Sequence, residues 1–427
     1  FSNDMKTMTF RMKNKSWEYN LSKNIISEKG DSEERNTAMP AGRFFGARTI
    51  SPDGSKEAFI RDYNLWIKEK QSGREYPLTK DGIKDYGYAT DNAGWKHSNN
   101  PVLLWSNDSK KIATFQQDER QVGDMYLVTT NVGHPKLESW KYPLPGDSVV
   151  AMIERVIINV DEHNPTVIRL KIPADYHRAT LGDDISEGGV LADAQWSNDN
   201  NSLVFVSSSR DHKQAKVRIA DARTGEVRDI FEETVPTQFE SGQSSISWRY
   251  LSSSNEIIWY SERDNRGHLY LYDASTGKLK NQITQGNFVV SSLVKVDEKA
   301  RKIYYMAAGL DTKNPYFQHF CVTDFSGKGF KDLTPEEGTH RVSLSPSGEY
   351  FVNSWSQPDI PSAFNLRNVK GDQIIDLGKS DITRLKESGW QAAIPFTVKA
   401  ADGVTDIYGL MFTPTNLGRN KKYPLVD

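Results

Sequence analysis

The residue types that carry out covalent catalysis occur in this chain, but their spacing forms none of the established catalytic motifs. A nucleophilic serine on a strand-to-helix turn needs the pattern Gly-x-Ser-x-Gly, because that strained turn accepts only small neighbours, and the sequence does not contain it. The zinc pattern His-Glu-x-x-His and the dinucleotide pattern Gly-x-Gly-x-x-Gly are also missing. We therefore expect no catalytic residue, no metal site and no cofactor in these 427 residues.

Three weaker chemical signals have structural explanations that we prefer. Gly378-Lys-Ser380 matches the end of a phosphate-binding loop, but Gln373 stands where that loop requires its first glycine. Asp161 and His163 form the tightest acid–histidine cluster, and a solvated turn is its favoured interpretation. The single cysteine, Cys321, permits neither an internal disulfide nor a thiolate metal cluster.

The composition is that of a folded protein without a nucleic-acid-binding surface. Apolar residues make up 37% and charged residues 26% of the chain, which excludes general disorder. The net charge is −2, whereas a nucleic-acid backbone requires a basic domain or stripe. No apolar run approaches the roughly 18 residues of a membrane-spanning helix. The chain starts at Phe1 and stops in a strand-like run at Asp427, so we expect both ends to continue into longer sequence.

The elements that would position functional side chains follow a repeated sequence pattern. Residues 216–226 and 268–278 each read as a strand, an Asp, a turn that ends in Gly, and a returning strand. The same frame recurs at 64–73, 124–128, 166–170, 319–324 and 363–367, with a weaker copy at 16–21. Aligning the copies on the Asp position gives a mean period of about 50 residues, within the range of propeller blades.

A second hairpin precedes most of these copies, so that one period holds four antiparallel strands. It reads as a strand, a turn rich in Ser, Pro, Asp and Gly, and a second strand at 49–60, 104–115, 195–206 and 342–352, with degenerate versions at 249–260 and 294–305. In residues 257–260 and 269–272 both strand parities are apolar or aromatic, as expected for sheets covered on both faces. We predict an all-β, eight-bladed β-propeller of four-stranded blades, or a seven-bladed one if the first copy is spurious.

The repeat ends before the chain does. Residues 381–388 favour a short helix, and residues 396–412 form a strong hairpin outside the repeat. We therefore predict a β-propeller over residues 1–390 and a short C-terminal β extension over residues 391–427.

The ordered set of these motifs resembles the N-terminal domain of dipeptidyl peptidase IV-like serine peptidases, in the S9 or prolyl oligopeptidase clan. The resemblance covers essentially the whole chain and rests on residues 102–115, 261–264, 268–273, 407–412 and 423–427. The last two stretches are similar to the entry into that family's α/β-hydrolase domain. The resemblance implies a non-catalytic propeller that gates and positions short peptide substrates, while the catalytic Ser, Asp and His lie beyond Asp427.

The resemblance also suggests three substrate-binding residues, each with a structural alternative. The paired Glu that grips the substrate amine in the family falls at residues 91–95 here, where no Glu occurs, so Asp91 is the candidate carboxylate and a loop Asx turn its alternative. Trp95 lines an apolar pocket or packs between blades. Arg11 corresponds to an Arg that holds the substrate carbonyl, or it is a solvated strand residue. For residues 261–264 a turn with paired charges is the default interpretation.

Location and partners follow from the resemblance alone. It implies an extracytoplasmic protein (periplasmic, secreted or membrane-anchored), short peptide substrates shared with the missing hydrolase domain, and a possible homodimer. The alternative is a free-standing propeller that acts as a scaffold for protein or ligand binding, since one fold serves many functions.

Overall fold

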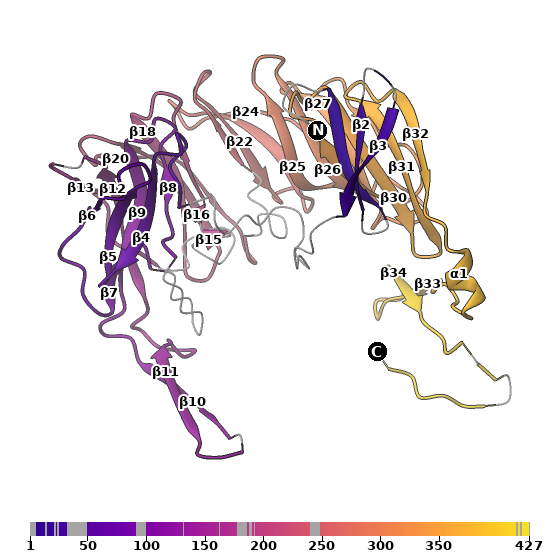
Figure 1. Cartoon of the computed structure of the whole chain (residues 1–427), viewed down its shortest axis with the longest axis horizontal. Coiled ribbons are helices and arrows are strands. Elements are labelled where there is room, and N and C mark those ends of the chain that lie inside the picture. Colours follow the sequence, from indigo (N-terminus) through magenta and orange to yellow (C-terminus); the bar gives the residue numbers. More distant parts are fainter. Residues whose placement is uncertain are drawn as a thin grey trace. The chain divides into compact units, whose positions relative to one another are not determined.

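The structure, a computed structural model, is almost entirely β-strand (Figure 1). In the part of the chain that it describes, α1 (Thr383–Glu387) is the one helix, so the all-β prediction and the predicted short helix are both confirmed. It describes all residues except 1–5, 13–14, 21–22, 24, 32–48, 91–99, 131, 162, 177–185, 188–189, 192, 240–247, 416, 419–420 and 427.

The chain divides into two compact units. One consists of Met39–Thr284, and the other combines Phe1–Ala38 with Gln285–Asp427. The predicted division into residues 1–390 and 391–427 stays a prediction.

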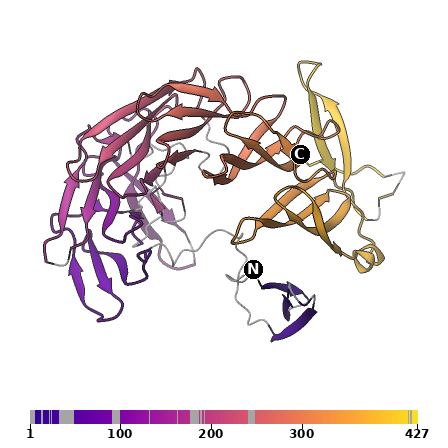
Figure 2. The same ribbon diagram turned by 90° about the horizontal axis from the view of Figure 1, so that it is seen from above.

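The Met39–Thr284 unit consists of antiparallel sheets that follow one another along the chain (Figure 2). Its first two sheets contain β4 (Lys56–Arg61), β5 (Asn64–Glu69) and β6 (Glu75–Pro77), then β7 (Tyr86–Tyr88), β8 (Leu104–Trp105), β9 (Lys111–Asp118), β12 (Met152–Asn159), β13 (Thr166–Arg169) and β14 (Asp175–Tyr176). Two four-stranded sheets follow, made of β17 (Ala194–Trp196), β18 (Ser202–Ser208), β19 (Gln214–Asp221) and β20 (Val227–Thr234), and of β21 (Arg249–Leu251), β22 (Glu256–Ser261), β23 (His268–Asp273) and β24 (Leu279–Gln282). A small two-stranded sheet pairs β15 (Ser186–Glu187) with β16 (Val190–Leu191).

The second unit repeats the four-stranded pattern twice. Its sheets are β1 (Thr7–Met12) with β2 (Lys15–Asn20) and β3 (Ile25–Asp31); β25 (Val289–Asp297), β26 (Lys302–Ala308), β27 (Gln318–Asp324) and β28 (Lys331–Asp332); and β29 (Thr339–Leu344), β30 (Tyr350–Gln357), β31 (Ile360–Asn368) and β32 (Gln373–Lys379). A hairpin of β33 (Ile394–Lys399) and β34 (Asp406–Met411) is the last β element of the described chain, as residues 396–412 predicted.

Apolar cores fill the spaces between consecutive sheets. All six residues of β22 are buried, and so are the first five of β23, which confirms that these strands are covered on both faces. The core around Trp248 and Trp259 joins β18 and β19 to β22 and β23, and another around Phe320 and Phe351 joins β26 and β27 to β30. Burial of both faces is the reason why the apolar residues in these strands do not alternate.

The Ser-x-Asp turns form a repeated link between sheets. In each turn the Ser hydroxyl donates a 2.6 Å hydrogen bond to the Asp two residues later, in the pairs Ser51–Asp53, Ser106–Asp108 and Ser197–Asp199. A backbone N–H of each turn then donates to a side chain of the next turn, from Asp53 to Ser109, from Asn107 to Asn200 and from Asn198 to Ser252, over 2.9–3.1 Å. The turns that mark the repeat in the sequence therefore also form hydrogen bonds between consecutive sheets.

Two repeat positions were assigned wrongly from the sequence. The segment 166–170 was expected to have a returning strand, but it contains β13, which pairs with β12 at the edge of its sheet and with no later strand of the described chain. The segment 124–128 was expected to be a blade strand, but it lies in β10 (Asp124–Thr129), which pairs only with β11 (Lys136–Lys141) in a separate two-stranded sheet of the described chain. The strand that pairs with β9 and continues that sheet is β12, which follows this insertion. The β10–β11 arm projects from its unit (Figure 1). The number of blades stays a prediction.

Candidate functional site

The three predicted substrate-binding residues cannot be compared as a site. Asp91 and Trp95 lie outside the described residues. Arg11 lies on β1, where its backbone pairs with Ser16, and its side chain also lies outside the description. Their role as substrate contacts stays a prediction.

The two weaker charged motifs are turns. The carboxylate of Asp161 accepts hydrogen bonds from the backbone N–H groups of His163 at 2.8 Å and Asn164 at 3.1 Å, which lowers its pKa and makes the segment an exposed Asx turn, as expected. In residues 261–264 the Arg263 guanidinium donates to Glu233 at 2.7 Å and lies over the Tyr270 ring at 4.3 Å. The paired charges expected there are present, but the partner Glu233 is 30 residues away in sequence and was not anticipated.

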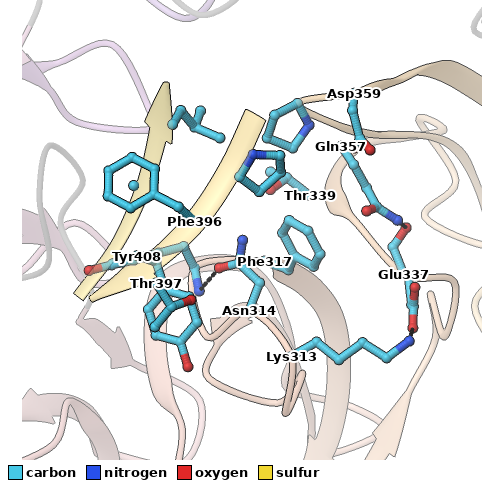
Figure 3. Close-up of a pocket in the computed structure, with 15 residues that line it drawn as sticks. Lys313, Asn314, Phe317, Glu337, Thr339, Gln357, Asp359, Phe396, Thr397 and Tyr408 are labelled. Carbon is cyan, nitrogen blue, oxygen red and sulfur yellow. Dashed lines mark hydrogen bonds and ion pairs between the residues drawn. The ribbon is translucent and has the colours of Figure 1, made fainter. Parts of the chain in front are cut away.

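A cavity of about 690 Å³ lies between the β33–β34 hairpin and the two sheets β25–β28 and β29–β32 (Figure 3). Residues from the 313–317 loop, the end of β30 and both strands of the hairpin line it. Its walls include six aromatic residues and prolines: Tyr316, Phe317, Pro358, Pro395, Phe396 and Tyr408. Tyr316 and Tyr408 meet edge to face with ring centroids 5.8 Å apart, which joins the loop to the hairpin.

Local turn chemistry positions the polar rim of the cavity. Asp311 accepts hydrogen bonds from the backbone N–H groups of Lys313 at 2.7 Å and Asn314 at 3.0 Å, which fixes the start of the loop. Gly338 has a φ of +140°, and a Cβ there would lie 2.7 Å from the carbonyl oxygen of Ser356. Only glycine therefore allows the chain to turn from Glu337 into β29.

The rim carries one exposed ion pair and one fixed amide. Lys313 donates to the Glu337 carboxylate, which raises the lysine pKa, and Gln357 donates to the Glu337 carbonyl oxygen at 3.2 Å (Figure 3). Among the residues that line the cavity there is no histidine, cysteine or serine. The arrangement is suited to holding an apolar or aromatic chain segment beneath a polar rim. Of the lining residues, the sequence had indicated only the hairpin.

A buried ionic cluster lies in the Met39–Thr284 unit. The Arg155 guanidinium donates to the Asp175 carboxylate at 2.7 Å, Ser207 donates to the same oxygen at 2.7 Å, and Arg218 approaches the other oxygen at 3.5 Å. Both Arg155 and Asp175 are almost wholly shielded from solvent. The sequence gave no signal for this cluster, because its members come from β12, β14, β18 and β19.

The described residues lack two further kinds of feature. They contain no group of three or more His, Cys, Asp or Glu side chains arranged to hold a metal ion. They also contain no helix with the length and apolar character needed to cross a bilayer. Burial raises the pKa of the Cys321 thiol, so the thiol stays protonated and is a poor nucleophile.

Comparison with known proteins gives consistent results. The chain is 24% identical over 420 residues to "Probable dipeptidyl-aminopeptidase B" of Aspergillus terreus, which covers 91% of this chain and 44% of that protein. It is 24% identical over 442 residues to the protein of the same name from Tuber melanosporum, covering 93% of this chain and 46% of that protein. The chain thus spans about half the length of the curated relatives that it matches.

The structural comparison shows the fold. The crystal structure of Porphyromonas gingivalis dipeptidyl peptidase 4 matches with a TM-score of 0.69 and 20% identity, over 98% of this chain and 57% of that one. The predicted fold class, an all-β propeller of four-stranded antiparallel blades, is confirmed. The family model described as the dipeptidyl peptidase IV (DPP IV) N-terminal region matches residues 2–362. With its antiparallel sheets in series and a match over most of its length, the chain belongs to the DPP IV N-terminal region family.

Proposed function

We propose that this chain is the non-catalytic propeller of a DPP IV-like serine peptidase, where it gates access for short peptides and positions them for cleavage. The family match over residues 2–362 carries the proposal, and the named relatives are dipeptidyl aminopeptidases about twice as long. In this proposal an α/β-hydrolase domain follows Asp427 and supplies the nucleophilic Ser, the His that transfers its proton and the Asp that orients the His.

The β33–β34 hairpin supports a further domain against it. All six residues of β33 are exposed, including Phe396 and Val398, and Ile407 and Leu410 of β34 are exposed as well. Neighbouring strand residues point to opposite faces, so apolar side chains are uncovered on both sides of the hairpin. An isolated two-stranded hairpin is at best marginally stable in water, and additional strands or a packed domain would stabilise it.

The test compares the 427-residue chain with the full-length gene product. We expect the full-length protein to hydrolyse chromogenic short peptides and the 427-residue chain to show no hydrolysis, because its nucleophile is missing. Hydrogen exchange gives a second readout: residues 394–411 should exchange more slowly in the full-length protein, because the hydrolase domain covers the hairpin. A gene that ends at the codon for Asp427, or a full-length protein without peptidase activity, would favour the free-standing binding scaffold.

We also propose that the protein forms a homodimer through the β10–β11 arm. Tyr126, Leu127, Val128 and Leu137 are exposed on this two-stranded sheet, and in the described chain no third strand pairs with it. Its ion pairs, Lys136–Glu138 and Lys141–Asp124, balance in charge, so the arm carries no net charge that would repel a second copy across a two-fold axis. A second copy is therefore the occupant we propose for this surface.

Size-exclusion chromatography with light scattering tests the dimer. We expect Leu137→Asp in the full-length protein to shift the dimer toward monomer, because a charge would be buried in the apolar contact. Leu279→Asp, on an exposed position of β24, is the matched control and should leave the mass unchanged. A wild-type monomer, or a dimer that is unaffected by Leu137→Asp, would contradict the arm as the interface.

An extracytoplasmic location is likewise a proposal that rests on the family resemblance. Cell fractionation of the full-length protein tests it, and a purely cytosolic pool would refute it.

A further inference from the structure

Two histidines are buried side by side between the sheets β25–β28 and β29–β32. His319 of β27 and His340 of β29 are 4% and 2% exposed, and their ring centroids lie 5.2 Å apart. The Trp355 ring stacks on His340 with a centroid distance of 5.9 Å. Neither histidine lines the neighbouring cavity, but Thr339, next to His340 in sequence, does.

Both ring nitrogens of His340 face hydrogen-bond acceptors. Its Nε2 lies 2.7 Å from the carbonyl oxygen of Glu336, which can only accept, and its Nδ1 lies 2.9 Å from Asn353 Oδ1. The orientation of Asn353 is fixed in turn, since its amide donates to Asn365 Oδ1, and the Asn365 amide donates to the Glu336 carboxylate at 3.3 Å. A neutral imidazole carries one N–H and leaves one acceptor unpaired, whereas a protonated imidazole satisfies both.

His319 also contacts this segment of the chain, at residues that precede Glu336. Its Nδ1 lies 2.9 Å from the carbonyl oxygen of Thr334 and 3.0 Å from the Asp332 carboxylate. Its Nε2 is buried without a hydrogen-bond partner. His319 therefore contacts Asp332 and Thr334, and His340 contacts Glu336. Both rings thus bind residues 332–336.

The surrounding charges favour the addition of one proton to the two rings, but not of two. The groups that face it are Asp311, Asp332, Glu336 and Arg367, with the hydroxyl of Tyr305 and the thiol of Cys321 near Asp332. Next to the rings, Asp332 and Glu336 carry two negative charges against one positive charge on Arg367, which pairs with Glu336. Asp311 adds a third negative charge, so the first proton is favoured, whereas a second would place two cations 5.2 Å apart in a buried site.

Burial affects the two rings differently. Burial opposes a charge on His319, but the hydrogen bond and negative charge of Asp332 outweigh it, so the pKa of His319 is raised. The pKa of His340 is lowered, by burial first and also by the neighbouring His319. The first proton therefore goes to His319, and its charge opposes protonation of His340, so the two rings are coupled.

We propose that His319 and His340 form one buried proton-binding site, and that the proton it takes up fastens residues 332–336 to the two sheets. On His319 the proton gives a charge-assisted hydrogen bond to Asp332, while the neighbouring His340 stays hydrogen-bonded to the Glu336 carbonyl oxygen. Glu337, which follows directly, lines the cavity and pairs with Lys313. Proton uptake therefore makes the part of the cavity wall that contains Glu337 more rigid.

Hydrogen exchange of the full-length protein between pH 8.5 and 5.5 tests the proposal, with rates corrected for the intrinsic effect of pH. We expect the protection of residues 332–340 to rise by about 3- to 10-fold as the pH falls through a single-proton transition, the gain of about one hydrogen bond. Residues 197–206, which contain no histidine, serve as the internal reference and should show no such transition.

Variants assign the transition to the pair. The double variant His319→Gln/His340→Gln should lose it, whereas His134→Gln, at an exposed histidine, should keep it. Asp332→Asn retains both rings and should move the midpoint down by about one pH unit, because it removes the favourable charge; this variant decides the question even if the double variant does not fold. The proposal is wrong if residues 332–340 follow the reference segment in the wild type, if the double variant keeps the transition, or if Asp332→Asn leaves the midpoint unchanged.

Discussion

Removal of the Asp175 carboxylate should destabilise the protein strongly, because it leaves the buried guanidinium of Arg155 without its ion-pair partner. The Arg155 and Asp175 side chains are only 2% and 10% exposed, and their atoms approach to 2.7 Å. In the described chain, Arg155 would retain the Val206 carbonyl oxygen at 3.3 Å and the Phe205 ring at 4.9 Å, neither of which carries a full negative charge. Loss of one partner of a buried pair costs about 3–5 kcal/mol, and we expect Asp175→Ala to fall in this range.

An exposed pair with the same contact distance provides the control. Arg61 and Glu75 also approach to 2.7 Å, but their side chains are 44% and 32% exposed. Solvent screens such a pair, so Glu75→Ala should cost about 0.2–1 kcal/mol. The two variants therefore separate the effect of burial from the effect of contact geometry.

Urea unfolding monitored by circular dichroism measures both values. The double variant Arg155→Met/Asp175→Ala should recover at least about 2 kcal/mol of the loss, because no uncompensated charge remains on Arg155. Equal costs for Asp175→Ala and Glu75→Ala, or a double variant less stable than Asp175→Ala alone, would refute the reasoning.

Three further predictions concern turns and substrate selectivity. Gly277→Ala should destabilise the chain by at least about 2 kcal/mol more than Gly403→Ala, since both glycines have φ near +70° but only at Gly277 would a Cβ meet an atom, the Ile230 carbonyl oxygen at 1.9 Å; equal urea midpoints would contradict this. The Ser197 hydroxyl and the Asn201 amides lower the pKa of Asp199 to about 2, so its stabilising contribution is present above the usual value of 3.8 and is lost as the pH falls toward 2. Urea midpoints from pH 5 to 2 should therefore fall less steeply in Asp199→Asn, and parallel curves would argue against the turn. Under the proposed peptidase function, the full-length protein should discriminate free from N-acetylated peptides about 10- to 150-fold less than a peptidase with two amine-binding carboxylates. Residues 91–95 contain no Glu, and a charged hydrogen bond contributes about 1.5–3 kcal/mol. Complete loss of cleavage on acetylation would indicate another carboxylate, with Asp91 the first candidate.

Local sequence patterns predicted most of the fold because the repeat is made of local hairpins. The Ser-x-Asp turns at Ser106 and Ser197, and the apolar strands around Trp259, lie where the period placed them. The pattern failed at residues 124–128, because a strand in an inserted hairpin has the same alternation and turn signals as a strand of a blade. Period alone cannot distinguish the two, since the difference lies in which strand β9 pairs with.

The candidate site was much less predictable. The hairpin around Phe396 and Tyr408 had a sequence signal, whereas the opposing Lys313 and Glu337 had none. Cavity walls are formed by residues distant in sequence, and no local pattern encodes which loops meet.

The sequence by itself determined the all-β class, the four-stranded unit, the late hairpin, the absence of a nucleophile motif and the resemblance to the DPP IV N-terminal region. Each of these depends on neighbouring residues or on a regular period. Only the tertiary structure decided that Arg155 meets Asp175, that the His319 and His340 rings are neighbours, and that apolar residues of β33 and β34 are exposed. The physical reason is that burial and charge pairing depend on residues from different strands, whose distances the fold sets and the order of residues does not.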